Sequence, residues 1–136
     1  MRSPLLSSAS LNLDLGLLLL RLLAGGLMLN HGIPKLQMIL ASNYQFGDPL
    51  GIGAGLSLFL VTFAEVVCAA LIIIGLFTKL ATIPLIIDMT VAFFIAHRPD
   101  PLAEKELPLL FLGIFITLLF TGPGGYSIDH SRSKRF

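Results

Sequence analysis

Four long apolar segments, separated by short polar stretches, dominate the pattern of the chain. They cover residues 13–30, 50–77, 80–96 and 107–121. The first is predicted to end or kink at "HGIPK", where Gly32 and Pro34 interrupt it. Because a membrane-spanning helix needs roughly 20 apolar residues, each segment is near the required length. The runs are continuous rather than alternating, which favours helices over strands.

This pattern predicts an all-α fold, an integral membrane four-helix bundle in which residues 1–136 form a single membrane domain. The fourth helix is expected to follow "EKELP", which places acidic side chains ahead of the apolar run and Pro108 in its first turn. The glycines of "TGPGG" are expected to end it. With an even number of spans, both termini lie on one side of the membrane.

Lysine and arginine residues in the short loops predict the orientation of the bundle. The side with both termini would carry Arg2, Lys79, Arg132, Lys134 and Arg135, and the opposite side Lys35, Arg98 and Lys105. Because cytoplasmic loops carry an excess of positive charge, both termini are predicted to be cytoplasmic, in a multi-pass protein of the inner (cytoplasmic) membrane. The loop from His31 to Pro49 and the polar "HRPDPLAEKE" would then face outward.

The composition agrees with a lipid environment and narrows the partners. The chain is 55% hydrophobic and 12% charged, with a mean hydropathy of +0.90, whereas soluble domains carry about 25% charged residues. A net charge of +1 provides no basic face, so the lipid bilayer is an expected partner and nucleic acid is not. The single cysteine, Cys68, excludes an internal disulfide and a CxxC redox pair.

Three ionisable residues fall inside the predicted spans: Arg21, Glu65 and Asp88. A charged group at membrane depth costs about 2.5 to 3.5 kcal/mol, which favours pairing. At the helical rise, Arg21 lies about 10 Å beyond Asp14 and Asp88 about 13 Å beyond Lys79, so their depths match. Arg21 is therefore predicted to pair with Glu65 or Asp88. The alternative is that it snorkels to the cytoplasmic headgroups and has no special role.

Glu65 is expected nearer the outer ends of the helices, because helical side chains lean toward their own N-terminus. That direction leads toward His31 and His97. Histidines on separate helices could ligate haem or, beside a carboxylate, relay protons. Interfacial histidines without a ligand are the favoured interpretation. Three histidines and one cysteine give little basis for a transition-metal site, so no metal is expected.

One face of the first helix carries Arg21, Gly25, Met28 and Gly32, at i, i+4, i+7 and i+11 spacing. Lys35 would continue this face if Pro34 did not bend the chain. Small residues on such a face are expected to allow close helix packing. The predicted intramembrane polar cluster, where a ligand would bind, consists of Arg21, Glu65, Asp88, His31, Lys35 and His97.

The stretches "RLLAGGLMLNHGIPKL", "FAEVVCAALIIIGLFTKLATIPL" and "GPGGYSIDH" together resemble the DoxX family of small four-helix integral membrane proteins. The family pattern has an arginine on the first helix, a Gly-x-x-Lys just after it, and a glutamate on the second helix. A Gly-Leu-x-Thr-Lys/Arg turn and a glycine-rich Ser-x-Asp ending follow. The matching positions are Arg21, Gly32, Lys35, Glu65, Gly75, Thr78, Lys79, Gly122, Gly124, Ser127 and Asp129.

The resemblance implies a four-helix membrane fold and a redox setting. Some relatives are subunits of quinone-linked sulfur oxidation, and others associate with membrane redox complexes. By analogy, the protein is expected to be a membrane subunit of a quinone-linked system, binding a quinone or other lipophilic ligand near Arg21 and Glu65. It would be at most a subunit of an oxidoreductase and not catalytic alone, because the sequence carries no redox centre of its own. Electrons would come from a redox-protein partner or from a bound substrate.

Two other roles stay open at this point. The protein could be a non-catalytic membrane partner that assembles or stabilises another protein, with its ion pairs only locking the helices together. A proton or small-solute pathway through Glu65 and Asp88 ranks last. Four helices leave little room for a channel unless the protein forms a homo-oligomer.

Overall fold

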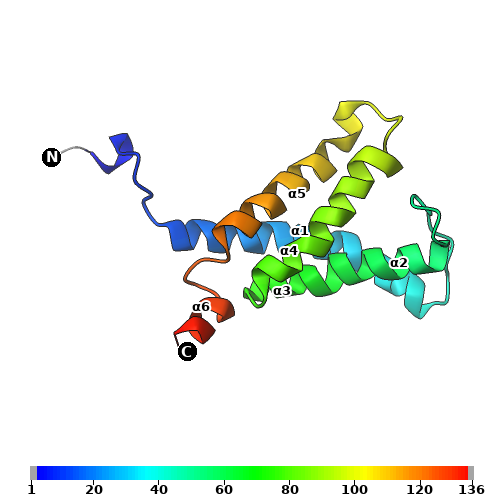
Figure 1. Cartoon of the computed structure of the whole chain (residues 1–136), viewed down its shortest axis with the longest axis horizontal. Coiled ribbons are helices and arrows are strands. Elements are labelled where there is room, and N and C mark those ends of the chain that lie inside the picture. Colours follow the sequence, from blue (N-terminus) through cyan, green and yellow to red (C-terminus); the bar gives the residue numbers. More distant parts are fainter. Residues whose placement is uncertain (1–2, 135–136) are drawn as a thin grey trace.

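The computed structural model describes residues 3–134, and every regular element within them is helical. In chain order the elements are η1 (Pro4–Leu6), α1 (Leu13–Leu40), α2 (Ala54–Thr62), η2 (Phe63–Cys68), α3 (Ala69–Ile74), α4 (Thr78–Val91), η3 (Ala92–Ala96), α5 (Leu102–Thr121) and α6 (Ile128–Ser133) (Figure 1). Both η2 and η3 are π-helical. The all-α prediction is confirmed. Arg2 and Arg135, which contribute to the predicted orientation, lie outside the described residues.

The first apolar segment forms α1, which begins where the Asn12 side chain accepts a hydrogen bond from the Leu15 N–H at 3.0 Å. The helix continues through Pro34 to Leu40, past the end predicted at residue 30. Much of the outer loop expected from residue 31 is therefore helical. A proline within such a helix is tolerated because neighbouring groups can satisfy the carbonyl that its ring leaves free.

A continuous helical rod follows, made of α2, η2 and α3. Its start is held by Asp48, whose carboxylate accepts hydrogen bonds from the Gly53 N–H at 2.8 Å and the Ser57 hydroxyl at 3.0 Å. The backbone N–H of Gly53 contributes most to holding the pKa of Asp48 below its usual value. The rod ends at Gly75, whose φ of +72° is a left-handed conformation that glycine adopts without steric cost.

Two further helical segments form a hairpin, α4 with its π-helical extension η3 and then α5. α5 begins at Leu102 rather than near residue 107, and its backbone is non-helical at Lys105, with φ −121° and ψ 16°. Pro108 accounts for this kink, because it has no N–H to donate to a carbonyl one turn earlier. The acidic residues before Pro108 thus lie within the first turns of the helix.

The long helical segments pack so that chain-distant elements meet at two ends of the molecule (Figure 1). α1 packs along the rod, and α4 packs along α5. At the end named here the Arg21 end, the start of α1, the α3–α4 turn, the end of α5 and α6 come together. The opposite end, the Lys35 end, holds the last turns of α1, the start of the rod and the α4–α5 loop. The core between them includes Ala24, Met28, Ala69, Ile72, Leu85, Phe115 and Leu118.

Three segments are long and apolar enough to cross a membrane: Leu13–Leu40, Ala54–Ile74 and Thr78–Ala96. Their outward faces carry large apolar side chains, such as Leu23, which is 61% exposed, and Ile87, which is 58% exposed. Such continuous apolar surface is a typical membrane interaction site.

Candidate functional site

The Arg21 guanidinium is enclosed, with the residue only 1% exposed, and its partners are backbone carbonyl groups. Nε donates to the Ile72 carbonyl and Nη2 to the Ile73 carbonyl, both at 2.9 Å. Nη1 donates to the carbonyls of Pro123 at 2.8 Å and Tyr126 at 3.0 Å. The charge therefore lies at the C-terminus of the rod, where the helix dipole favours a cation.

These contacts contradict the predicted pairing of Arg21 with Glu65 or Asp88, and equally its snorkelling to headgroups. Glu65 packs against Gly32, which lies about 16 Å further along α1 than Arg21. Asp88 lines a pocket at the Lys35 end. Four of the five guanidinium N–H groups are already committed. Arg21 therefore joins the rod to the C-terminal segment and is not the ligand-binding group that the sequence suggested.

Asp129 also holds the Arg21 end together, and these two residues with their backbone partners are named here the structural cluster. Its two carboxylate oxygens accept hydrogen bonds from the backbone N–H groups of Phe77 at 2.8 Å and Thr78 at 2.9 Å, which caps the start of α4. The Asp129 N–H in turn donates to the Gly75 carbonyl at 2.9 Å. The α3–α4 turn is thus tied to the C-terminal segment by both the side chain and the backbone of one residue.

The glycine-rich segment that precedes Asp129 adopts backbone that favours glycine. Gly122 has a φ of +74° and Gly124 a φ of +86°. The Lys79 side chain runs beside Gly122, since a Cβ there would lie 3.3 Å from Lys79 Cε. The Ser127 hydroxyl donates to the Gly124 carbonyl at 2.7 Å. These positions of the family pattern therefore have a structural explanation.

A pocket of about 440 Å³ opens at the Lys35 end between α1, the rod, and the α4–α5 hairpin. Lys35 Nζ lies 2.5 Å from Glu65 Oε2 and donates to the His31 carbonyl at 3.3 Å. The Glu65 side chain is 6% exposed and that of Lys35 22%. This pair is therefore largely removed from water, and breaking it would leave one charge unpaired at a cost of several kcal/mol.

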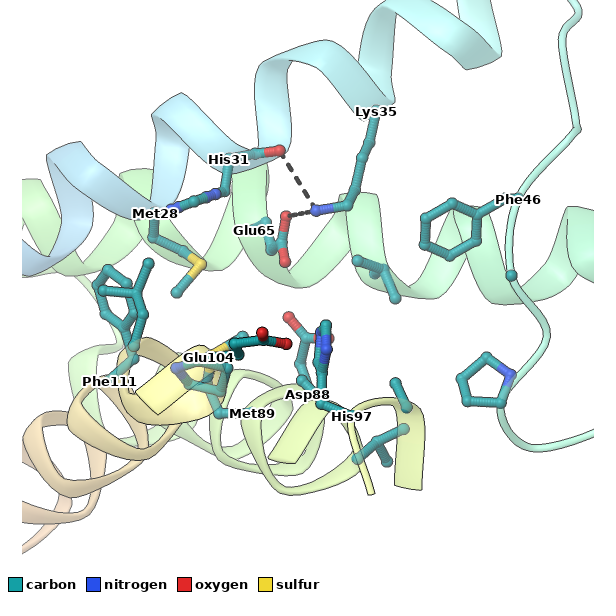
Figure 2. Close-up of a pocket in the computed structure, with 18 residues that line it drawn as sticks. Met28, His31, Lys35, Phe46, Glu65, Asp88, Met89, His97, Glu104 and Phe111 are labelled. Carbon is teal, nitrogen blue, oxygen red and sulfur yellow. Dashed lines mark hydrogen bonds and ion pairs between the residues drawn. The ribbon is translucent and has the colours of Figure 1, made fainter. Parts of the chain in front are cut away.

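The opposite wall of the pocket carries a second set of polar groups. Figure 2 shows Asp88, His97 and Glu104 facing the Glu65–Lys35 pair across it. Asp88 Oδ2 is buried and has no hydrogen-bond partner among the described residues. His97 Nδ1 lies 2.8 Å from an Asp100 carboxylate oxygen. The pocket thus places a cation and three carboxylates around one cavity.

Apolar side chains close the floor of the pocket. The His31 ring meets the Phe111 ring edge to face, with centroids 6.1 Å apart, and Met28 lies beside it. Figure 2 shows Met28 and Phe111 together at the side of the pocket away from Phe46. The site therefore offers both an apolar wall and polar groups, the combination typical of small-molecule sites.

Gly32 and a π-helical segment together place Glu65. A Cβ at Gly32 would lie 2.8 Å from the Glu65 backbone, so only glycine allows α1 to approach this closely. Glu65 belongs to η2, which is part of the rod. The second π-helical segment, η3, lines the same pocket from the α4–α5 hairpin. Both π-helical segments in residues 3–134 thus border one cavity, and π-bulges occur frequently at functional sites.

The structure gathers five of the six residues of the predicted polar cluster around the pocket: His31, Lys35, Glu65, Asp88 and His97. Arg21 is the exception. Glu104 is a pocket carboxylate absent from the prediction. Its only signal was the acidic "EKE" run, which fits a helix start equally well. Within residues 3–134, no group of three or more His, Cys, Asp or Glu side chains is placed to hold a metal ion.

An all-helical chain with several apolar spans, and with charged groups enclosed between them, is an integral membrane protein of the small multi-helix class. The protein belongs to the DoxX family, whose model matches residues 16–98. That region contains the arginine, Gly-x-x-Lys, glutamate and Thr-Lys positions of the pattern. The C-terminal positions Gly122, Ser127 and Asp129 lie beyond it.

Two relatives match most of the chain. An uncharacterized membrane protein of Mycobacterium tuberculosis is 33% identical over 141 residues, covering 85% of this chain and 80% of the relative. An uncharacterized protein of Haemophilus influenzae is 29% identical over 127 residues, covering 85% of this chain and 90% of the relative. No solved structure matches the chain.

Proposed function

We propose that the pocket at the Lys35 end binds the polar head of a lipophilic ligand, a quinone, and that the protein is a membrane subunit of a quinone-linked redox system. The observation that carries this proposal is the buried Asp88 Oδ2, which has no hydrogen-bond partner within residues 3–134 and lines the same cavity as the Lys35–Glu65 pair. Buried polar atoms are normally hydrogen-bonded, so an unpartnered one beside a cavity is a position where a ligand or a water molecule can bind.

The polar groups of the pocket suit a quinone and its reduced form. An ammonium has three donors, and Lys35 uses two of them, on Glu65 and on the His31 carbonyl. The third can donate to a quinone carbonyl oxygen. Asp88 offers an acceptor for a hydroxyl group when the ring is reduced. The residues on the two walls therefore complement both states of one ligand, and Arg21 plays no direct part.

A bound quinone would supply the electron-carrying chemistry. The residues of this chain would bind and orient the ring and hold protons near its oxygens, since Glu65, Asp88 and His97 line the same cavity. The single cysteine, Cys68, is buried in the core, so the chain has no thiol pair with which to pass electrons. Electrons would come from a redox-protein partner.

We further propose that the chain is a single domain of four spans with both termini in the cytoplasm. The apolar part of α5, residues 107–121, is about 22 Å long at the helical rise, and a short span of this kind can be accommodated where the bilayer thins locally. The Arg21 end carries Lys79, Arg132 and Lys134. Lys35 is committed to the pocket, which leaves Arg98, in the α4–α5 loop, and Lys105, in the first turns of α5, as the cations at the opposite end. This bias supports a cytoplasmic location for the Arg21 end.

The test is mass spectrometry of the organic extract of protein purified in mild detergent. Stoichiometric quinone is expected from the wild type. Lys35→Met and Asp88→Asn should each reduce the amount of bound quinone at least about tenfold, because a hydrogen bond to a charged group contributes roughly 1.5 to 3 kcal/mol. Lys105→Met is the matched control, since Lys105 lies over the Phe93 ring at the same end without lining the pocket. Bulk lipid alone in every sample would favour the non-catalytic assembly role.

A further inference from the structure

A second, mainly apolar groove of about 330 Å³ lies between α2 and α4. Its lining includes Leu60, Phe63, Pro84 and Ile87. Three of these are open to the outside: Leu60 is 51% exposed, Phe63 49% and Ile87 58%. Because the groove is bordered by two of the helices that are long and apolar enough to span a membrane, we expect its mouth to face the acyl chains of the bilayer.

The groove is continuous with the polar pocket. Four residues line both cavities: Pro49, Val61, Asp88 and Val91. Besides Asp88, the groove has one other polar side chain, Ser57, and its hydroxyl is already donated to Asp48. Asp88 therefore stands at the junction, with its unpartnered oxygen where the apolar groove meets the charged pocket.

From this juxtaposition we propose that the groove is a tail-binding site. The ligand is a single-chain amphiphile whose head lies in the polar pocket and whose alkyl or isoprenoid tail passes Asp88 and lies between α2 and α4. The ligand enters sideways from the bilayer through this groove. The inference rests on the proposed function for the head group and adds the tail, its path and the route of entry.

An acyl or isoprenoid chain gains little free energy by leaving lipid for an apolar groove, because both surroundings are apolar. The groove therefore determines where the tail lies and which ligands fit, while the polar contacts at Lys35 and Asp88 supply the binding free energy. A ligand entering from water would instead have to pass the charged mouth of the pocket with its tail exposed.

The experiment is photolabelling of the full chain in phosphatidylcholine vesicles with a decylubiquinone that carries a diazirine at the end of its decyl chain. Label is expected on peptides of α2 and α4 that line the groove. Ile87→Trp fills the mouth of the groove and should lower this labelling about tenfold, because the indole occupies the volume that the tail needs. Ile83→Trp, one turn away and outside the lining, should stay within about twofold of the wild type.

A second probe separates failure of the tail site from failure of the proposed function. The same benzoquinone ring without its decyl chain reports on the head pocket through its competition with the photoprobe. If the ring competes but the tail labels α1 or α5, the tail site is wrong and the head site stands. The same conclusion follows if a diazirine-labelled phospholipid gives the identical pattern. If neither quinone binds, both proposals are overturned.

Discussion

Replacing Arg21 with glutamine probes the structural cluster that the sequence did not reveal. The guanidinium donates four hydrogen bonds of 2.8 to 3.0 Å to backbone carbonyls in a residue that is 1% exposed. A glutamine amide has two donors, so at least two carbonyls lose their partner. At roughly 1.5 to 3 kcal/mol for each hydrogen bond to a charged group, the free energy of unfolding should fall by about 3 to 6 kcal/mol.

The assay is reversible unfolding of the detergent-solubilised protein by SDS titration, followed by circular dichroism. Arg98→Gln is the matched control, because it makes the same chemical change at an exposed residue of the opposite end, and it should change the free energy by less than about 0.5 kcal/mol. A loss below about 1 kcal/mol for Arg21→Gln would refute the contacts described here, since a single net hydrogen bond is worth that much.

A double-mutant cycle decides between these contacts and the pairing predicted from the sequence. Arg21 and Glu65 lie at levels about 16 Å apart along α1, so the effects of Arg21→Gln and Glu65→Gln should add to within about 0.5 kcal/mol. A coupling free energy well above that value would mean that the two side chains interact and that the guanidinium does not lie among the carbonyls.

Three further predictions use the same preparation. Asp129→Ala removes the acceptor of two backbone N–H groups at the start of α4 and should lower the free energy of unfolding by about 0.5 to 2 kcal/mol; no change would exclude this capping role. Gly32→Ala places a Cβ 2.8 Å from the Glu65 backbone and should cost about 1 to 3 kcal/mol. Gly26→Ala, with nothing within 4 Å, should be neutral or slightly stabilising, and equal effects would contradict the close approach. Because the folded pKa of Asp48 is depressed, its capping is complete above the ordinary pKa of 3.8 and is lost as the pH falls through the lower folded value. Backbone hydrogen exchange at residues 52 and 53, corrected for intrinsic rates, should therefore lose protection only in strong acid, and Asp48→Asn should abolish that pH dependence.

The helices could be predicted from the sequence because their causes are local. Continuous apolar runs allow only backbone that satisfies its own hydrogen bonds, and Asn12 and Gly75 carry the ordinary signals of a helix start and a helix end. The limits of α1 and α5 were less predictable. Whether a helix passes Pro34 or begins before Pro108 depends on what packs around the proline, and the residue pattern contains no such information.

The candidate site likewise contains residues whose positions could be predicted from the sequence and residues whose partners could not. Side-chain direction and spacing are enough to predict that Glu65 lies on the same side as His31 and His97, and all three line the pocket. The partners of Arg21 could not be read in this way, because every residue has a backbone carbonyl and nothing marks the four that converge on one guanidinium. Lys35 reaches Glu65 only because α1 stays helical beyond Pro34.

The contacts of Arg21 also impose an order of events on the synthesis of the protein. The carbonyls of Pro123 and Tyr126 lie 102 and 105 residues further along the chain. At 5 to 20 residues per second, translation reaches them about 5 to 20 s after Arg21. For the first half of that interval the arginine lacks all four acceptors, because Ile72 and Ile73 lie 51 and 52 residues further along the chain, and for the rest it lacks two. The Arg21 end therefore closes only after residue 126 has been made, and a nascent chain stalled before that point exposes an unsatisfied cation to the cell's insertion machinery.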